Sequence, residues 1–285
     1  MEVRSGDELP VSSILAIAKK EFKESISNRW FLVLSVIFFL LILQIPYIVL
    51  MLLGFFSYSN IPGKTGIFLA HAISFGGLIT LIVGSLSIIT EKEQDTLSFL
   101  LTQPIRKLEI IIGKFFGLLL VISLMMSIGF GLAMLPSIGE EEIINIGFLN
   151  FIYSILVMVG SASVMIGLAI AISVISASRT MAVSLALFTW LFFTLIYSSG
   201  FLGYMLITVN ETQAYFYFIF LNPIEISNTI MHLILNPILS PSLPARFMVN
   251  YFGIGGSFVP LGIGLLIWSA APIVFSIIEF YSREY

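Results

Sequence analysis

Long apolar runs alternate with short polar segments along most of this 285-residue chain. Six of the runs reach the roughly 20 residues that an α-helix needs to cross a bilayer. They cover residues 31–56, 67–89, 110–135, 151–175, 181–207 and 258–280. Backbone amides in lipid have no water to bond, so each run is predicted to be a helix. The pattern predicts an all-α membrane protein, with a six-transmembrane-helix bundle forming a single domain over residues 1–285.

The segment 208–257, between the fifth and sixth runs, is apolar but is broken repeatedly by prolines and polar residues. A seventh span here would place Glu225 and His232 in lipid, which is costly. The aromatic run at 215–220 suits the headgroup level of a membrane. We therefore expect one or two short external or re-entrant helices in this segment.

The composition agrees with a bilayer environment. Only 10% of the residues are charged and 58% are hydrophobic, and the mean hydropathy is +1.07, whereas soluble domains carry roughly 25% charged residues. The chain has no cysteine, which excludes disulfides and cysteine-ligated metals. Charged residues interrupt the first 30 positions, so no signal peptide is expected.

The positions of the basic residues predict the orientation. If the N-terminus is cytoplasmic, 11 of the 13 Lys and Arg residues lie inside, and only Lys64 and Arg246 lie outside. Cytoplasmic loops of membrane proteins carry this excess of Lys and Arg. A seven-span chain would move Arg283 outside. We therefore expect a multi-pass protein of the cell membrane with both termini in the cytoplasm.

Residues 13–29, before the first run, form a predicted amphipathic helix. Its apolar residues recur at helical spacing, and its charged residues lie largely on other faces. The apolar positions are Ile14, Ala18, Phe22 and Ile26, and the charged ones are Lys19, Lys20, Lys23 and Glu24. Such a helix would lie in the inner membrane interface. A basic anchor that only fixes the topology is the alternative.

Residues 91–103, between the second and third runs, form a second predicted cytoplasmic helix. Its acidic start suits a helix N-terminus, and Leu97, Leu100 and Leu101 form an apolar stripe at i, i+3 and i+4. Pro104 breaks the helix before Arg106. A short helix with one apolar face is typical of an element that docks in a partner's groove. The alternative is an interfacial helix that rests on lipid.

Several of these segments resemble the ABC-2 type family of ABC-transporter permeases, and within it most closely the NosY-type permeases associated with nitrous-oxide reductase maturation. The similar segments are IAKKEFKESISNRW at 17–30, TEKEQDTLSFLLTQPIRKLEIIIGK at 90–114, Gly129-Phe130-Gly131, Leu221-Asn222-Pro223 and the chain end at 280–284. One departure concerns the docking segment, because Asp95 stands where the family has Gly before Thr-Leu.

The resemblance implies an exporter of two permease chains, expected as a homodimer in membrane lipid, with two ABC ATPase chains. ATP and Mg would bind the ATPase, and this chain would hold no cofactor and catalyse no reaction. A NosY-like system would serve copper-enzyme maturation and could include an extracytoplasmic accessory protein. No nucleic-acid partner is expected. The implied coupling-helix residues are Glu91, Glu93, Thr96, Leu97, Leu100, Leu101, Pro104 and Arg106. The implied interface-helix residues are Lys19, Lys20, Glu21, Phe22 and Arg29.

Other chemical signals in the sequence are weak. Gly63-Lys64-Thr65 resembles the end of a phosphate-binding loop, but Tyr58 stands where that loop needs Gly. ATP hydrolysis is therefore expected on a separate chain. The two histidines, His71 and His232, have no acid at helical spacing beside them, so no metal site is expected.

Two other function classes fit the sequence less well. A secondary transporter or channel usually carries ionisable groups near the membrane midplane, and the six runs have almost none. An intramembrane enzyme needs a nucleophile and a base within reach, and no such pair is evident. Small residues recur every four positions at Gly113 and Gly117, which would let helices approach closely, within the chain or across a dimer.

Overall fold

The computed structural model describes residues 11–52, 64–97, 102, 105–134, 141–207, 212–235 and 242–283. Every regular element within these ranges is a helix, which confirms the predicted all-α class for this part of the chain. In order they are α1 (Val11–Ser27), α2 (Arg29–Leu52), α3 (Lys64–Ser85), α4 (Ile89–Glu93), α6 (Lys107–Met134), α7 (Glu141–Ile175), α8 (Arg179–Leu191), η3 (Phe192–Tyr197), α9 (Ser198–Ile207), α10 (Thr212–Phe220), α11 (Pro223–Leu235) and α12 (Leu243–Ser282).

Within the described residues, five helical stretches are long and apolar enough to cross a membrane. They are Ala70–Glu93, Lys107–Leu132, Leu149–Ile175, Arg179–Phe201 and Leu243–Ser282. A sixth candidate is the pair α1 and α2, which passes the same test together but is bent by 68°. The bend falls at Asn28, whose side-chain oxygen accepts a hydrogen bond from the backbone N–H of Trp30 (2.9 Å) and so caps α2.

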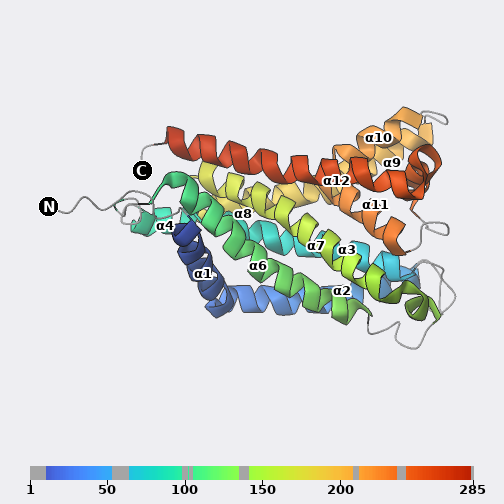
Figure 1. Cartoon of the computed structure of the whole chain (residues 1–285), viewed down its shortest axis with the longest axis horizontal. Coiled ribbons are helices and arrows are strands. Elements are labelled where there is room, and N and C mark those ends of the chain that lie inside the picture. The colour runs from blue at the N-terminus through green and yellow to red at the C-terminus, as the bar shows by residue number, and fades with distance from the viewer. Residues whose placement is uncertain are drawn as a thin grey trace.

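The long helices lie side by side along the long axis of the molecule, with α7 in contact with α12, α3 and α6 (Figure 1). The core follows this axis and includes the fully buried rings of Phe38, Phe130 and Phe280. The outer helices are much less covered: only 17% of the apolar window of Arg179–Phe201 and 11% of that of Leu243–Ser282 are buried. Both therefore offer broad apolar faces to lipid or to a partner chain.

Many hydroxyl groups inside these apolar helices are satisfied locally, although Oγ of Ser123 and Oγ of Ser161 have no hydrogen-bond partner within the described residues. Ser35 Oγ donates to the carbonyl of Phe31 (2.8 Å), Thr80 Oγ1 to that of Gly76 (2.7 Å) and Ser276 Oγ to that of Pro272 (2.6 Å). Each bond reaches back to the preceding helical turn, so the hydroxyl needs no water. These residues therefore fit helices surrounded by hydrocarbon.

We call the two ends of the bundle the charged end and the aromatic end. The charged end holds α1, α4, the start of α6 and the start of α8 (Figure 1). Its defining residues are Lys20, Glu21, Glu91, Lys114 and Arg179, which form ion pairs there.

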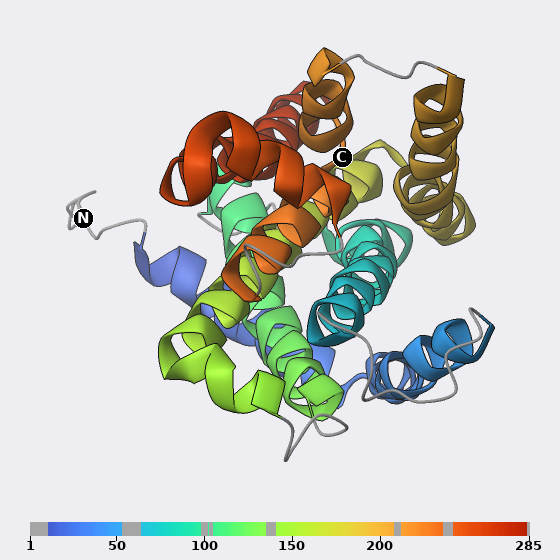
Figure 2. The ribbon, with the colours of Figure 1, turned by 90° about the vertical axis from the view of Figure 1, so that its right-hand side faces the viewer.

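The aromatic end lies opposite and holds α10, α11 and the start of α12 (Figures 1 and 2). Its defining residues are Phe216, Phe220, Phe247, Tyr251 and Phe252, whose rings pack against one another. Phe216 is central, since its ring lies 4.9 Å from that of Phe247 and 5.2 Å from that of Tyr251.

The segment 208–257 contains α10, α11 and the first part of α12, so its apolar character is divided among three short helical pieces. The piece within α12 ends at Gly253, whose backbone is non-helical (φ 73°, ψ 170°). Only glycine adopts this conformation without strain. The long final helix starts beyond this break and runs through Pro260 and Pro272 without a second one.

Candidate functional site

The short helix α4 is held at the charged end by contacts from two neighbouring helices. The chain turns after Ser85, and the N–H groups of Ile88 and Ile89 both donate to Oγ of Ser173 on α7 (3.0 Å each). In the same turn, the carbonyl of Ser87 accepts a hydrogen bond from Lys114 Nζ on α6 (3.0 Å). These contacts satisfy backbone groups that the break between α3 and α4 leaves free. They fix where α4 begins.

A buried lysine at the centre of this end joins three helices. Lys114 Nζ on α6 lies 2.8 Å from Oε2 of Glu21 on α1 and 3.1 Å from Oε1 of Glu91 on α4. Its side chain is only 3% exposed. Lys20 Nζ on α1 adds a second contact to the same Glu91 oxygen at 3.2 Å. We call these four residues the lysine–glutamate network.

Two glycines allow α1 to come close enough for this network to form. A Cβ added at Gly113 would lie 2.7 Å from Cβ of Ile17, and one at Gly117 would lie 2.7 Å from the carbonyl oxygen of Ala18. At Gly117 it would also lie 2.7 Å from Cβ of Glu21. The two small residues thus act within the chain, where they bring the backbone of α1 against α6.

A second ion pair ties the end of α4 to the start of α8. Arg179 Nε lies 2.7 Å from Oε2 of Glu93, and the Arg179 backbone N–H donates to Oε1 of the same carboxylate (2.8 Å). Ser178 caps α8 by accepting a hydrogen bond from the N–H of Met181 (3.2 Å). The Glu93 carboxylate therefore lies at a helix N-terminus, where negative charge is favourable.

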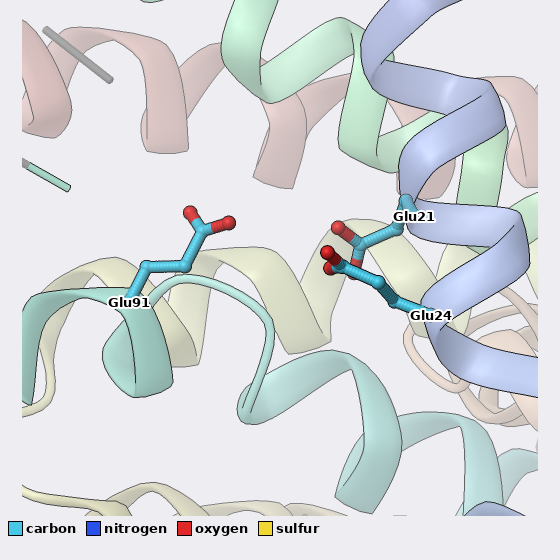
Figure 3. A group of neighbouring side chains, drawn as sticks. All are labelled: Glu21, Glu24 and Glu91. Atoms are coloured by element: carbon cyan, nitrogen blue, oxygen red, sulfur yellow. The ribbon is translucent and has the colours of Figure 1, made fainter. Parts of the chain in front are cut away.

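Three carboxylates of this end lie close together, those of Glu21 and Glu24 on α1 and of Glu91 on α4 (Figure 3). Their oxygens are within 4.8 Å of one another, a spacing that could hold a metal ion. However, Lys114 and Lys20 already contact all three groups, and Glu24 is largely exposed. We therefore interpret the group as part of the lysine–glutamate network.

The predicted interface-helix residues lie on α1, except for Arg29, which is exposed at the start of α2. Most of the expected apolar stripe faces the bundle: Ala18 is buried and Phe22 packs against the core, whereas Ile26 is exposed. Glu21 is also buried, together with Ile17. A charged residue lies in the buried face because its carboxylate meets Lys114, a contact that hydrophobic periodicity cannot reveal.

The predicted coupling-helix residues lie on more than one element. Glu91 and Glu93 are on α4, which ends before a turn at Gln94 and Asp95, and a new helical turn begins at Thr96. Thr96 is exposed, and its Oγ1 donates to the carbonyl of Glu91 (3.2 Å).

The apolar face of this segment is turned inwards at its first leucine. Leu97 is only 2% exposed and packs in the core, so it anchors the segment to the bundle. Arg106 is exposed just before α6. Leu100, Leu101 and Pro104 lie outside the described residues.

Asp95 has a left-handed backbone (φ 56°), and among the described residues it is the one non-glycine with positive φ. That conformation favours glycine, the residue expected at this position from the family resemblance.

Sequence reasoning missed three residues that position this site: Lys114, Arg179 and Ser173. Lys114 offered a signal, because a lysine inside an apolar run needs a buried partner. Arg179 and Ser173 offered none, since their partners on α4 are more than 80 residues away in the sequence.

The aromatic end has its own connection, between the π-helix η3 and the helix α11. Asn222 is fully buried and donates from Nδ2 to the carbonyl of Phe193 in η3 (2.9 Å). Its Oδ1 accepts from the N–H groups of Ile224 (3.0 Å) and Glu225 (3.4 Å) and so caps α11. A π-helix leaves carbonyls out of the regular α-helical pattern, and Asn222 satisfies one of them.

Comparison with known proteins extends over most of the chain. The family model described as ABC-2 family transporter protein matches residues 15–285. A protein of Pseudomonas aeruginosa, named as a probable ABC transporter permease protein NosY, is 30% identical over 201 residues, covering 68% of this chain and 72% of its own length. A protein of Stutzerimonas stutzeri with the same name is 27% identical over 220 residues, and the match covers 76% of this chain and 80% of that protein.

Proposed function

Because the chain belongs to the ABC-2 family of transporter proteins, we propose that it forms the substrate pathway of an exporter driven by ATP that a separate chain hydrolyses. Family membership makes the chain a multi-pass membrane protein and the permease subunit of an ABC transporter, which works with an ABC ATPase. The finer proposal has six spans, with α2 as the first and α1 as an interface helix before it, and both termini in the cytoplasm. The charged end then faces the cytoplasm and the aromatic end faces outward.

One observation carries the mechanical part of this proposal: Glu91 and Glu93 on α4 are bound by charged residues from three other helices. Lys20 belongs to α1, Lys114 to α6 and Arg179 to α8. A displacement of the segment 91–103 by a docked ATPase would therefore move these helices together. The buried Lys114–Glu91 pair suits this role because breaking a buried ion pair costs several kcal/mol. The partly exposed pairs of Lys20 and Arg179 add less.

The movement has a continuous route to the opposite end. Arg179 begins α8, which continues into η3, and η3 is joined to α11 through Asn222. Contacts along this route are between packed helices, which shift as units and are not continuously deformable. ATP-driven closure at the cytoplasmic side would in this way open or close the pathway outside.

The assembly that we propose contains two copies of this chain and two ATPase chains, with ATP and Mg bound to the ATPases. The sparsely covered faces of the fifth and last spans support contacts with lipid and with the second copy. From the resemblance to NosY-type permeases we extend the proposal to a NosY-like system of copper-enzyme maturation, with an extracytoplasmic accessory protein at the aromatic end. Loss of copper from that enzyme on deletion of this chain would test the extension.

Docking is tested with the exposed residues of the turn after α4. Gln94→Arg with Thr96→Arg places two bulky cations on the predicted ATPase contact, while Leu97 stays in the core. We expect an ABC ATPase, identified by peptide sequencing and by its ATP hydrolysis, to co-purify with the full chain and to be lost from this variant. Asn250→Arg, an exposed change at the aromatic end, is the matched control. Equal recovery of the ATPase from both variants would contradict docking at this turn.

The main alternative is a secondary transporter or channel that needs no ATPase. The full chain purified without other proteins is placed in liposomes, and ion currents and ion-driven uptake are measured. We expect neither, because the pathway is proposed to open only when a docked ATPase closes on ATP. Ion-coupled transport by the chain alone would overturn the proposed function.

A further inference from the structure

We infer that the polar side of α11 is a ligand site for a linear polyamine, that is, a chain carrying several protonated amino groups. The four residues concerned are Glu225, Asn228, Thr229 and His232, which we call the α11 polar stripe. At 100° per residue they fall within about one third of the helix circumference. The inference relies on the proposed function only in regarding the ligand as cargo.

The stripe is the uncovered side of a helix that is otherwise packed. α11 contacts α12, α7 and α3 (Figure 2), and Ile226, Ile230 and Leu233 are buried on its other sides. Glu225, Asn228 and His232 remain partly accessible, at i, i+3 and i+7. The packing therefore fixes the direction of the stripe and leaves three of its four residues partly accessible, whereas Thr229 is buried beneath them.

Polar atoms of the stripe lack partners in the described part of the chain. Oδ1 of Asn228 and Oγ1 of Thr229 are buried without a hydrogen bond, and Thr229 as a residue is fully buried. Buried polar atoms left without a partner cost free energy, so native structures seldom keep them. Two such atoms on adjacent residues indicate a place for a donor from outside the chain.

The carboxylate of Glu225 also lacks a cationic partner among the described residues, and the phenol of Tyr197 is the titratable group recorded near it. Burial raises the pKa of Glu225 to about 7 and lowers the pKa of His232 to about 4. Both shifts are those of side chains that have lost water without gaining a counter-charge. The network at the charged end differs, since lysines neutralise its carboxylates.

The unpartnered atoms of the stripe accept hydrogen bonds, and the Glu225 carboxylate beside them favours donors with positive charge. A carboxylate, an amide oxygen and a hydroxyl all accept hydrogen bonds, and ammonium groups have only donors. Glu225 and His232 are seven residues apart, on the order of 10 Å along the axis, which is too far for one metal ion to bind both. An extended ligand with amino groups at intervals can contact the whole stripe.

The test measures binding of spermidine to the full chain in nanodiscs of pure phosphatidylcholine, so that no lipid supplies a primary amine. We expect Glu225→Gln to weaken spermidine binding at least tenfold and Asn228→Leu about threefold. Glu279→Gln, at the opposite end, should leave it unchanged. Size-exclusion profiles and helix content are recorded for each variant, and Asn228→Leu provides a second reading if Glu225→Gln fails to fold.

Two further experiments distinguish a polyamine from other ligands. In the first, Mg²⁺ is tested in place of spermidine. In the second, phosphatidylethanolamine is added to the nanodiscs; if this lipid competes with spermidine, the site binds a lipid headgroup amine, and the inference of a free polyamine is wrong. Binding of Mg²⁺ alone, equal binding by wild type and Glu225→Gln, or no spermidine binding by wild type would each overturn the inference. No ATPase is present, so failure of the proposed function leaves these results unaffected.

Discussion

The charged end and the aromatic end solve the same problem, burial of polar groups in an apolar bundle, in opposite ways. At the charged end, Lys114 and Lys20 neutralise Glu21 and Glu91 across three helices. At the aromatic end, helices are joined by neutral side-chain to backbone hydrogen bonds, such as Trp268 Nε1 to the carbonyl of Phe220 (2.9 Å) and Tyr197 OH to that of Tyr217 (2.8 Å). Two buried atoms of the α11 polar stripe there, Oδ1 of Asn228 and Oγ1 of Thr229, have no hydrogen-bond partner in the described part of the chain.

The two ends are therefore expected to differ in stiffness, with the charged end the stiffer one. Separation of buried charges is costly, so α1, α4 and α6 are expected to move as one body. Neutral hydrogen bonds contribute roughly 1 kcal/mol each, and the aromatic end also contains the non-helical Gly253 and the π-helix η3. Such backbone irregularities are common at functional hinges. We therefore expect the charged end to move as a rigid unit that transmits displacement, and the aromatic end to change its conformation.

The largest effect is expected for Lys114→Met, which leaves Glu21 and Glu91 buried without their shared cation. Removal of one partner from a buried ion pair typically costs about 3–5 kcal/mol. We expect a destabilisation of that size in detergent-titration unfolding of the purified chain. Lys20→Met, whose side chain is 46% exposed, should cost less than about 1 kcal/mol.

A further variant shows whether charge is the cause. Lys114→Met combined with Glu21→Gln and Glu91→Gln removes the unpaired carboxylates and should recover part of the loss. If the triple variant were as unstable as Lys114→Met alone, lost packing of the lysine side chain would explain the effect and the stiff ion-pair model would fail.

A smaller effect is expected for Gly117→Val, which pushes α1 away from α6. Its Cβ would meet the backbone oxygen of Ala18 at 2.7 Å, an atom that cannot move without the whole helix. Forced overpacking costs roughly 1–3 kcal/mol, and the distance between Glu21 and Lys114 should grow. Gly131→Val on the same helix is the matched control, because a Cβ there meets nothing within 4 Å.

The free energy of unfolding is measured for both variants. The distance between α1 and α6 is followed by the rate of disulfide crosslinking between a cysteine introduced on each helix. Crosslinking that is equally fast in both would show that Gly117 does not set the helix spacing.

At the aromatic end, Asn222→Ala should have a moderate and local effect. It removes the cap of α11 and the bond to Phe193 together, and each such loss costs about 1 kcal/mol. Asn222→Ser keeps an accepting oxygen for the cap but is too short to reach Phe193, so it should retain the cap and lose only the connection to η3. Hydrogen exchange should rise in α11 and η3 for Ala, and mainly in η3 for Ser. Uniform exchange across all spans would contradict a local joint.

How far the sequence predicted these features depends on the distance over which each one acts. Apolar runs report a surrounding of hydrocarbon, whether lipid or protein, so the all-α class and the approximate positions of the long helices could be predicted. The network could not be, because Glu21 and Lys114 lie 93 residues apart and meet only after α1 folds back at Asn28. The same limit applies to the inward-facing Leu97, since a short apolar stripe does not reveal which side its own bundle covers.

The smallest effect is expected at Asp95. It tests whether the side chain of Asp95, in the turn after α4, contributes to the stability of the charged end. Asp95 holds a left-handed backbone (φ 56°), which costs an L-residue roughly 1 kcal/mol. Asp95→Gly should therefore stabilise the chain by about 0.5–1 kcal/mol in the same unfolding assay, while Asp95→Asn should be nearly neutral because Asn tolerates this region. Gln94→Gly is the control, since Gln94 has an ordinary backbone (φ −95°) and should only lose stability. If Asp95→Gly also destabilised the chain, the aspartate side chain, and not its backbone, would be what the turn requires, and the turn would then belong with the ion-paired residues of the charged end.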